Sequence, residues 1–87
     1  MSMKIVAKEI EMICHFSKKG ITPLKFKYQC EDGDKVIKVD KVISRTSEKL
    51  CGNIAIIFDC QSVIDGVEKL YQLKYLVSDM KWLLFKI

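Results

Sequence analysis

One stretch decides the fold: Leu24-Lys25-Phe26-Lys27-Tyr28-Gln29-Cys30, in which apolar residues at the even positions alternate with polar residues at the odd ones. Successive side chains of a β-strand point to opposite faces, so the alternation predicts a strand with one buried and one solvated face. Residues 31–34 then read Glu-Asp-Gly-Asp, and an Asp-Gly pair tolerates the positive φ angles of a tight hairpin turn. The stretch predicts a β-hairpin within an antiparallel sheet.

The remainder of the chain repeats this pattern of short apolar segments separated by turn residues. Periodicity of two residues is typical of half-buried strands. We therefore predict an all-β fold, a six-stranded antiparallel meander that closes into a small, partly open β-barrel within one domain, 1–87. The predicted strands cover residues 6–16, 24–30, 36–43, 54–58, 67–77 and 80–87.

Three places in the meander need separate treatment. The third strand changes the parity of its apolar positions near Asp40-Lys41, which predicts a bulge or a barrel corner. The residues from Thr46 to Asn53 are rich in loop formers, so we expect the longest connection there, with room for one turn of 3₁₀ helix. Residues 62–77 fit either a helix or a hairpin, and Asp65-Gly66 favours the hairpin because glycine is unfavourable inside a helix.

The edges of the sheet are the remaining structural question. An unpaired edge strand is a template for aggregation unless it is closed or guarded. We expect strand one to pair with strand six, or with strand five across a bent sheet. The alternative is an open edge that a second subunit caps.

Composition limits the class of protein. The 87 residues carry a net charge of +4, with 49% hydrophobic residues. The longest apolar runs, 54–58 and 82–85, are too short to span a membrane, and charges at residues 8, 9 and 11 argue against a secretory signal. Four cysteines without a CxxC pair are typical of free thiols in the reducing cytosol. We therefore expect a cytoplasmic protein that has no membrane partner and needs no cofactor.

A broader resemblance rests on several short segments, and the likeness covers most of the chain. The sequence resembles short bacterial proteins of Gram-positive anaerobes that have no assigned activity. The resemblance implies a stand-alone β domain and transfers no catalytic residue. The segments that carry it are 35–42, 52–53, 58–62, 66–69 and 81–87.

A catalytic or metal site is not predicted. The single histidine, His15, neighbours Cys14, and adjacent strand residues point to opposite faces, which argues against a nucleophile-base pair and against a zinc site. Asp59 is the one acid inside an apolar strand, and an outward position paired with a lysine is its ordinary role. No phosphate-binding loop or nucleophile elbow occurs in the sequence. We expect a non-enzymatic protein.

Two binding functions remain. Aromatic residues on the last hairpin predict an exposed surface for an unknown protein partner or for a second copy. We favour this interaction or self-assembly function, and its residues are Trp82, Phe85, Tyr71 and Tyr75. The alternative is single-stranded nucleic-acid binding by a basic strand face that offers a stacking ring. Its residues are Lys25, Lys27, Lys35, Lys38, Lys41 and Tyr28.

Overall fold

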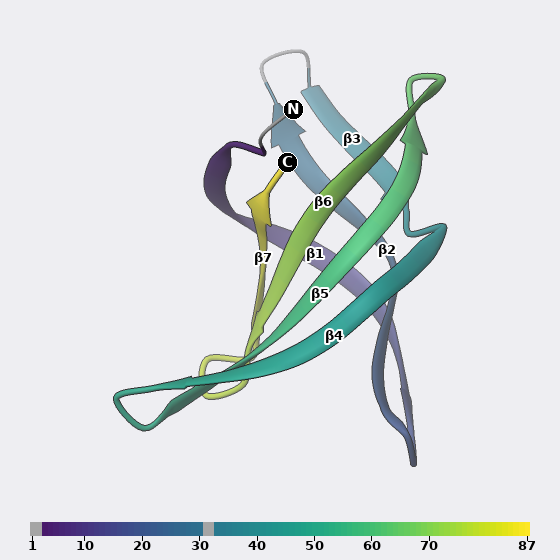
Figure 1. Cartoon of the computed structure of the whole chain (residues 1–87). Helices are drawn as coiled ribbons and strands as arrows, with labels where there is room; N and C mark the ends of the chain where they lie inside the picture. Colours follow the sequence, from purple (N-terminus) through teal and green to yellow (C-terminus); the bar gives the residue numbers. More distant parts are fainter. Residues whose placement is uncertain (1–2, 31–32) are drawn as a thin grey trace.

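The computed structural model describes residues 3–30 and 33–87 and confirms the predicted all-β antiparallel class. No helix occurs in these residues. Seven strands form one sheet in the order β3-β2-β1-β7-β6-β5-β4 (Figure 1). They are β1 (Ile5–Ser17), β2 (Gly20–Cys30), β3 (Gly33–Lys38), β4 (Lys41–Leu50), β5 (Asn53–Ile64), β6 (Val67–Leu76) and β7 (Lys81–Lys86).

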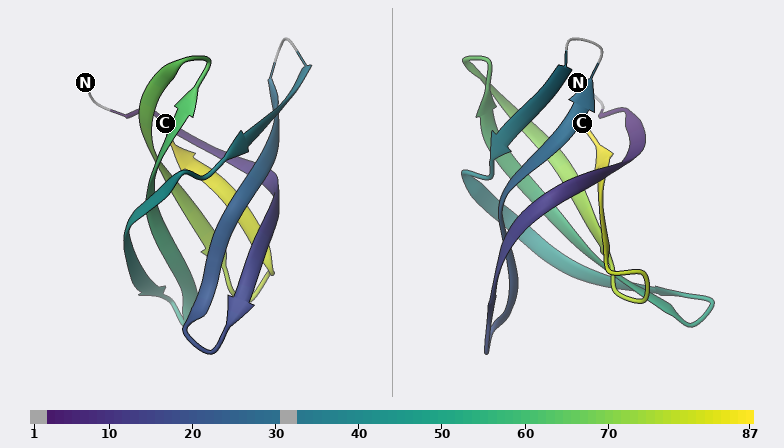
Figure 2. Two further views of the ribbon diagram at one scale, coloured as in Figure 1. Left: turned by 90° about the vertical axis from the view of Figure 1, so that its right-hand side faces the viewer. Right: turned by 180° about the vertical axis from the view of Figure 1, so that it is seen from behind.

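The predicted pairing of the first strand with the last is confirmed. The N-terminal half of β1 pairs with β7, so that Ile10 lies opposite Trp82, whereas its C-terminal half pairs with β2. This pairing curls the sheet into an open half-barrel. It does not remove the edges, because β3 and β4 now end the sheet. The left view of Figure 2 looks onto the open side, with β4 on the left and β2 on the right.

The predicted third strand is two strands. The chain leaves β3 after Lys38 and enters β4 at Lys41, and only Val39 and Asp40 lie between them. The parity change near Asp40-Lys41 therefore marks a corner where the chain passes from one edge of the sheet to the other. The sequence predicts one strand here, and six in all, because a two-residue corner disturbs the alternation of apolar residues no more than a bulge within one strand does.

The predicted loop from Thr46 to Asn53 is wrong. These residues form the C-terminal half of β4 and a two-residue turn in which Cys51 and Gly52 have φ angles of +52° and +82°. Both angles are positive, as in the type I′ turn that joins twisted strands. Polar residues occur here because β4 is an edge strand, and an exposed edge needs no alternation of apolar side chains.

Two hairpins were predicted at Asp-Gly pairs, and the structure describes the turn residues of only one of them. The hairpin within residues 62–77 is confirmed, since β5 and β6 pair from Ile64 and Val67 outward and Asp65 and Gly66 have φ angles of +52° and +79°. The pairing of β2 with β3 is also confirmed, beginning at Cys30 opposite Gly33. The turn residues Glu31 and Asp32 lie outside the described residues.

The core occupies the concave face of the sheet, which we call the inner face. Residues of six strands project into it and bury their side chains there, because the curl turns one parity of each strand inward. Ring contacts link different strands within this core, including Phe26 of β2 with Tyr71 of β6 and Phe58 of β5 with Trp82 of β7. The buried apolar residues are Ile10, Phe26, Ile37, Phe58, Cys60, Ile64, Tyr71, Leu73, Tyr75, Trp82 and Leu84.

A buried serine joins β5 to the corner between β3 and β4. Ser62 Oγ donates to the carbonyl of Lys38 at 2.7 Å and accepts the N–H of Asp40 at 3.3 Å. Tyr71 Oη lies 2.6 Å from the same oxygen. A serine hydroxyl has one proton, which Ser62 gives to Lys38, so Tyr71 is the donor in this pair. The hydroxyl thus replaces the backbone ladder that β3 and β5 do not form.

We expect Ser62→Ala to destabilise the fold more than Tyr71→Phe does. The alanine leaves the Lys38 carbonyl, the Asp40 N–H and the Tyr71 hydroxyl without their shared partner, so the free energy of unfolding should fall by about 2–3 kcal/mol. Tyr71→Phe removes one donor and leaves the other two bonds, which should cost about 1 kcal/mol. Urea unfolding of both variants measures the difference, and equal losses would contradict this account of the serine.

Stability should also fall in alkaline solution. Burial raises the pKa of the Cys60 thiol from 9.0 to about 12, and the charge of Asp59 adds to the rise. Burial raises the pKa of Tyr71 from 10.0 to about 12, although its hydrogen bond with Ser62 acts in the opposite direction. The folded-state values exceed the ordinary ones, so this stability is fully present below about pH 9 and is lost as the pH rises through about 12.

Urea midpoints measured from neutral pH upward test this linkage. The midpoint should decline once the pH exceeds the ordinary pKa of the thiol. Cys60→Ala serves as the control, since it removes one of the two titrating groups and should flatten the decline. An alkaline profile as flat as the neutral one would contradict the linkage.

Candidate interaction edge

The predicted aromatic surface is wrong for three of its four residues. Tyr71, Tyr75 and Trp82 lie in the core, with 1%, 9% and 7% of their surface exposed. The curl of the sheet turns these residues inward from both strands of the last hairpin, so they present no surface to a partner. Only Phe85 points to the convex outer face, where it is partly buried and Lys74 Nζ lies 3.7 Å from its ring centroid.

The structure also separates the predicted nucleic-acid residues. Lys25 lies opposite Lys38 on the outer face of β2 and β3, and Lys27 is their neighbour there. Tyr28 has the opposite parity and packs against Phe26 on the inner face, so the stacking ring and these three lysines lie on different faces. A platform that combines Tyr28 with Lys25, Lys27 and Lys38 is therefore wrong.

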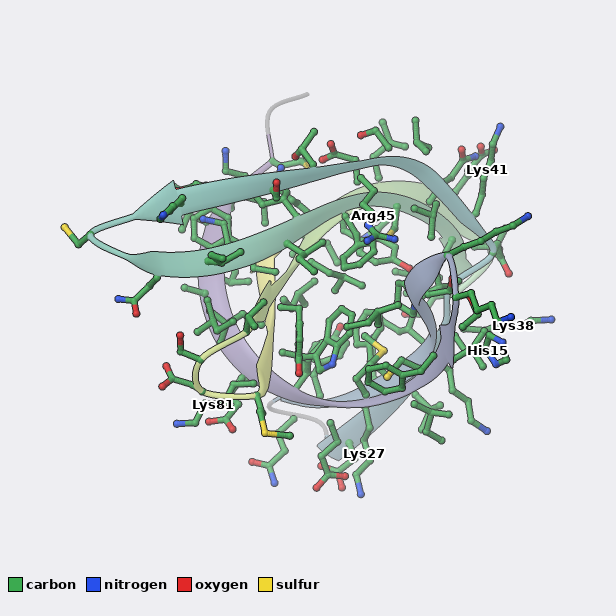
Figure 3. All side chains as sticks on the ribbon, turned by 90° about the horizontal axis from the view of Figure 1, so that it is seen from below. His15, Lys27, Lys38, Lys41, Arg45 and Lys81 are labelled. Carbon is green, nitrogen blue, oxygen red and sulfur yellow. The ribbon has the colours of Figure 1, made fainter. Side chains whose placement is uncertain are left out.

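The charges of the predicted lysines are partly neutralised and spread over both faces, since Lys35 lies opposite Tyr28 on the inner face. Lys27 Nζ lies 3.4 Å from Asp34 and 4.0 Å from Glu11, while Lys35 Nζ pairs with Asp65 at 2.9 Å. Lys41 begins β4, beyond the corner that follows Lys38. Seen from below, Lys27, Lys38, Lys41 and Lys81 point outward at separate places on the rim (Figure 3). These cations form no concentrated patch for a phosphate backbone.

The residues considered for chemistry lie apart from one another. His15 is exposed and Cys14 is partly buried against the core, as the alternation predicts. Asp59 faces outward, as predicted, but its partners are neutral: Ser44 Oγ donates to it at 2.7 Å and Gln72 Nε2 at 3.0 Å. Within residues 3–30 and 33–87, no group of His, Cys, Asp and Glu side chains is arranged to hold a metal ion.

Among the strands that the structure describes, β4 ends the sheet and leaves its outer side unpaired over ten residues. The Val77 N–H donates to the Ile54 carbonyl, so the backbone groups of Ile54 point toward β6. Because these groups alternate in direction along a strand, even-numbered residues of β5 hydrogen-bond to β6 and odd-numbered residues to β4. The odd residues of β5 lie opposite even residues of β4. The backbone N–H and C=O groups of Arg45, Ser47 and Lys49 therefore point away from the sheet, and we call this row the β4 edge.

The charged side chains in the middle of β4 are held by their own chain. Arg45 points toward the concave side of the sheet (Figure 3), where it stays exposed and its Nη1 donates to the Lys19 carbonyl at 3.3 Å. Glu48 lies on the outer face, 3.8 Å from Lys74 Nζ. Charged side chains guard many natural edge strands against pairing. Near the centre of the β4 edge, these two side chains are directed to other partners and leave the backbone accessible.

An uncovered apolar surface lies beneath this edge. The hairpin of β1 and β2 crosses under the N-terminal half of β4, and its end extends past the β4 edge (Figures 1 and 2). Phe16 lies next to the turn of this hairpin, on the same face of β1 as Met12 and Cys14, which pack against the core. Its side chain is nevertheless 66% exposed. A strand added to β4 would extend the β6-β5-β4 side of the sheet over this hairpin.

Sequence reasoning missed the β4 edge because it assigned Thr46 to Asn53 to a loop. The signal was weak, since serine, threonine and charged residues are common in both loops and exposed strands. The Cys51-Gly52 turn was the one local clue, because glycine supplies the positive φ that a two-residue hairpin requires.

No protein-family model, curated protein or solved structure matches this chain. The described residues contain no helix of the length and apolarity that crossing a membrane requires. The geometry of the β4 edge is therefore the main guide to function.

Proline substitutions test the direction of the β4 amides. Thr46→Pro removes an N–H that bonds to β5 and should lower the free energy of unfolding by about 2–3 kcal/mol. Ser47→Pro removes an N–H that points to solvent, so its effect should stay within about 0.5 kcal/mol. Thermal or urea unfolding measures both variants. If Ser47→Pro is as destabilising as Thr46→Pro, the assignment of outward groups is wrong.

Proposed function

We propose that this protein is a non-enzymatic interaction module that binds an extended chain segment by strand addition along the β4 edge. The observation that carries the proposal is the unpaired outer side of Lys41–Leu50. Backbone hydrogen bonds supply affinity in this mode of recognition, and side chains at alternate positions supply selectivity. The exposed ring of Phe16, on the β1–β2 hairpin that crosses under β4, offers an apolar contact for the inward side chains of the added strand.

Several features support this function over nucleic-acid binding. The outer lysines lack a stacking ring, and Lys27 already faces two carboxylates. Strand addition requires only backbone groups that the structure leaves unpaired. A cytoplasmic location is part of the proposal, because Cys14, Cys51 and Cys60 are free thiols and the exposed Cys51 would be open to oxidation elsewhere.

A peptide selection tests the proposal without a known partner. Random displayed dodecapeptides are selected on the immobilised protein, and the selected peptides are titrated against wild type, Ser47→Pro and Ser47→Ala. Ser47→Ala keeps the backbone N–H, so it should bind like wild type. Ser47→Pro should weaken binding by about tenfold or more, because it removes a hydrogen bond and adds a steric block.

Hydrogen exchange of a peptide complex supplies the second readout. The outward amides of Arg45, Ser47 and Lys49 should exchange rapidly in the monomer, measured at high dilution, and slowly in the complex. The inward amides of Ser44, Thr46 and Glu48 should be slow in both states. Selected peptides that bind Ser47→Pro as well as wild type, or a selection that yields no peptide, would overturn the proposal.

A further inference from the structure

We infer that the segment that occupies the β4 edge is β4 of a second copy of this chain, paired antiparallel about a two-fold axis at Thr46. The inference rests on the proposed function, since it takes the β4 edge as the binding site. It adds the identity of the partner and the register of the pair. Three features of the structure point to a second copy: the charges along β4, the small residues at its centre and the shapes on either side of it.

The register follows from the charges on β4. Directly opposite residues of an antiparallel pair lie on the same face, and a two-fold axis pairs residues that are equally distant from it. With the axis at Thr46, Arg45 lies opposite Ser47 of the second copy, and Ser44 lies opposite Glu48. No like charges meet. The outward backbone groups of Arg45 and Ser47 are then in position to hydrogen-bond with each other across the interface.

Neighbouring registers are less favourable. An axis at Arg45 or at Glu48 would place a charged residue opposite its own copy, and like charges directly opposite each other destabilise a strand pair. An axis at Ser47 would place Arg45 opposite Lys49. An axis at Ser44 would move the pair onto the irregular register between Val42 and Ser44. Thr46 is therefore the centre that the sequence of β4 favours.

Small side chains make the centre of the edge suitable for close pairing. Ser44, Thr46 and Ser47 carry no charge, and Ser44 directs its hydroxyl to Asp59. Cross-strand threonine pairs are among the favourable pairs of antiparallel sheets. The two copies of Thr46 would meet on the outer face at the axis.

Shape complementarity gives a further argument for a second copy. The β1–β2 hairpin lies under the N-terminal half of β4, whereas the end of the β4–β5 hairpin extends beyond the rest of the sheet (Figures 1 and 2). A two-fold rotation places the β1–β2 hairpin of each copy under the C-terminal half of β4 of the other. This brings Phe16, which is 66% exposed, toward the inner side of β5, where Ile54 is 44% exposed.

The charge of the chain predicts how this dimer responds to salt. Each copy carries a net charge of +4, so two copies repel each other at a distance. Added salt screens this repulsion, with a Debye length of about 8 Å at physiological ionic strength. The dimer should therefore become tighter as salt is added. Binding to a phosphate backbone would weaken under the same change.

Disulfide trapping tests the register. The exposed Cys51 is first replaced by asparagine, which tolerates its positive φ, and Thr46→Cys is introduced into this background. Thr46 would face its copy at a pair without hydrogen bonds, where Cα atoms are about 4.5 Å apart and a disulfide fits. Ser47→Cys in the same background is the matched control, since its copies would be offset along the strands.

The expected result is a disulfide dimer of Thr46→Cys in a glutathione buffer, at least about tenfold more abundant than that of Ser47→Cys. Peptide mapping identifies the linked residues. Phe16→Ser should weaken the dimer in sedimentation equilibrium, while urea unfolding at high dilution should show a nearly unchanged monomer, because the ring is exposed. Preferential trapping of Ser47→Cys would overturn the register, and with it the inference.

The experiments also separate this inference from the proposed function. If the chain stays monomeric at all concentrations and Thr46→Cys is not trapped, while selected peptides still bind in a manner sensitive to Ser47→Pro, the second copy is excluded as the partner and strand addition stands. If peptide binding is insensitive to Ser47→Pro, the proposed function fails, and a trapped Thr46 dimer would then be an assembly unrelated to peptide recognition.

Discussion

A β-sheet that does not close must end in two strands whose backbone groups lack partners on one side, and this constraint governs the surface of the protein. The structure meets it differently at its two ends. At the β3 end, side chains replace the missing ladder: Ser62 binds the corner at Lys38 and Asp40, and Lys35 pairs with Asp65. At the β4 end, the backbone of Arg45, Ser47 and Lys49 points outward without a neighbouring strand.

The curl of the sheet follows from the way β1 divides its pairing. Its C-terminal half continues the ladder of β2, and its N-terminal half pairs with β7. The aromatic residues of the last hairpin are consequently turned into the concave side, where Tyr75 and Trp82 lie 4.9 Å apart between ring centroids. A flat sheet with the same sequence would expose these rings. The curl therefore supplies the core and removes the aromatic surface that the sequence suggests.

Local sequence patterns predicted the parts of the fold that depend on local chemistry. The alternation in Leu24–Cys30 and the Asp65-Gly66 turn each determine their own backbone, and the pairing of the first strand with the last follows from the need to close a meander. The division of residues 36–43 into two strands and the extension of β4 to Leu50 depend on which strands become edges. That outcome is set by the curl of the whole sheet, so residue periodicity could not reveal it.

The same reasoning explains why the candidate site lies where the sequence is least apolar. A segment such as Ser44–Glu48 has few residues that would be buried in a monomer, and by composition it resembles a loop. In the structure it is extended because one side of its backbone is satisfied by β5, while the other side stays available. Its charged side chains have partners in their own chain: Arg45 donates to the backbone carbonyl of Lys19, and Glu48 pairs with the ammonium group of Lys74. An exposed strand whose charges are held by its own chain is suited to pairing, and a loop of the same composition is not.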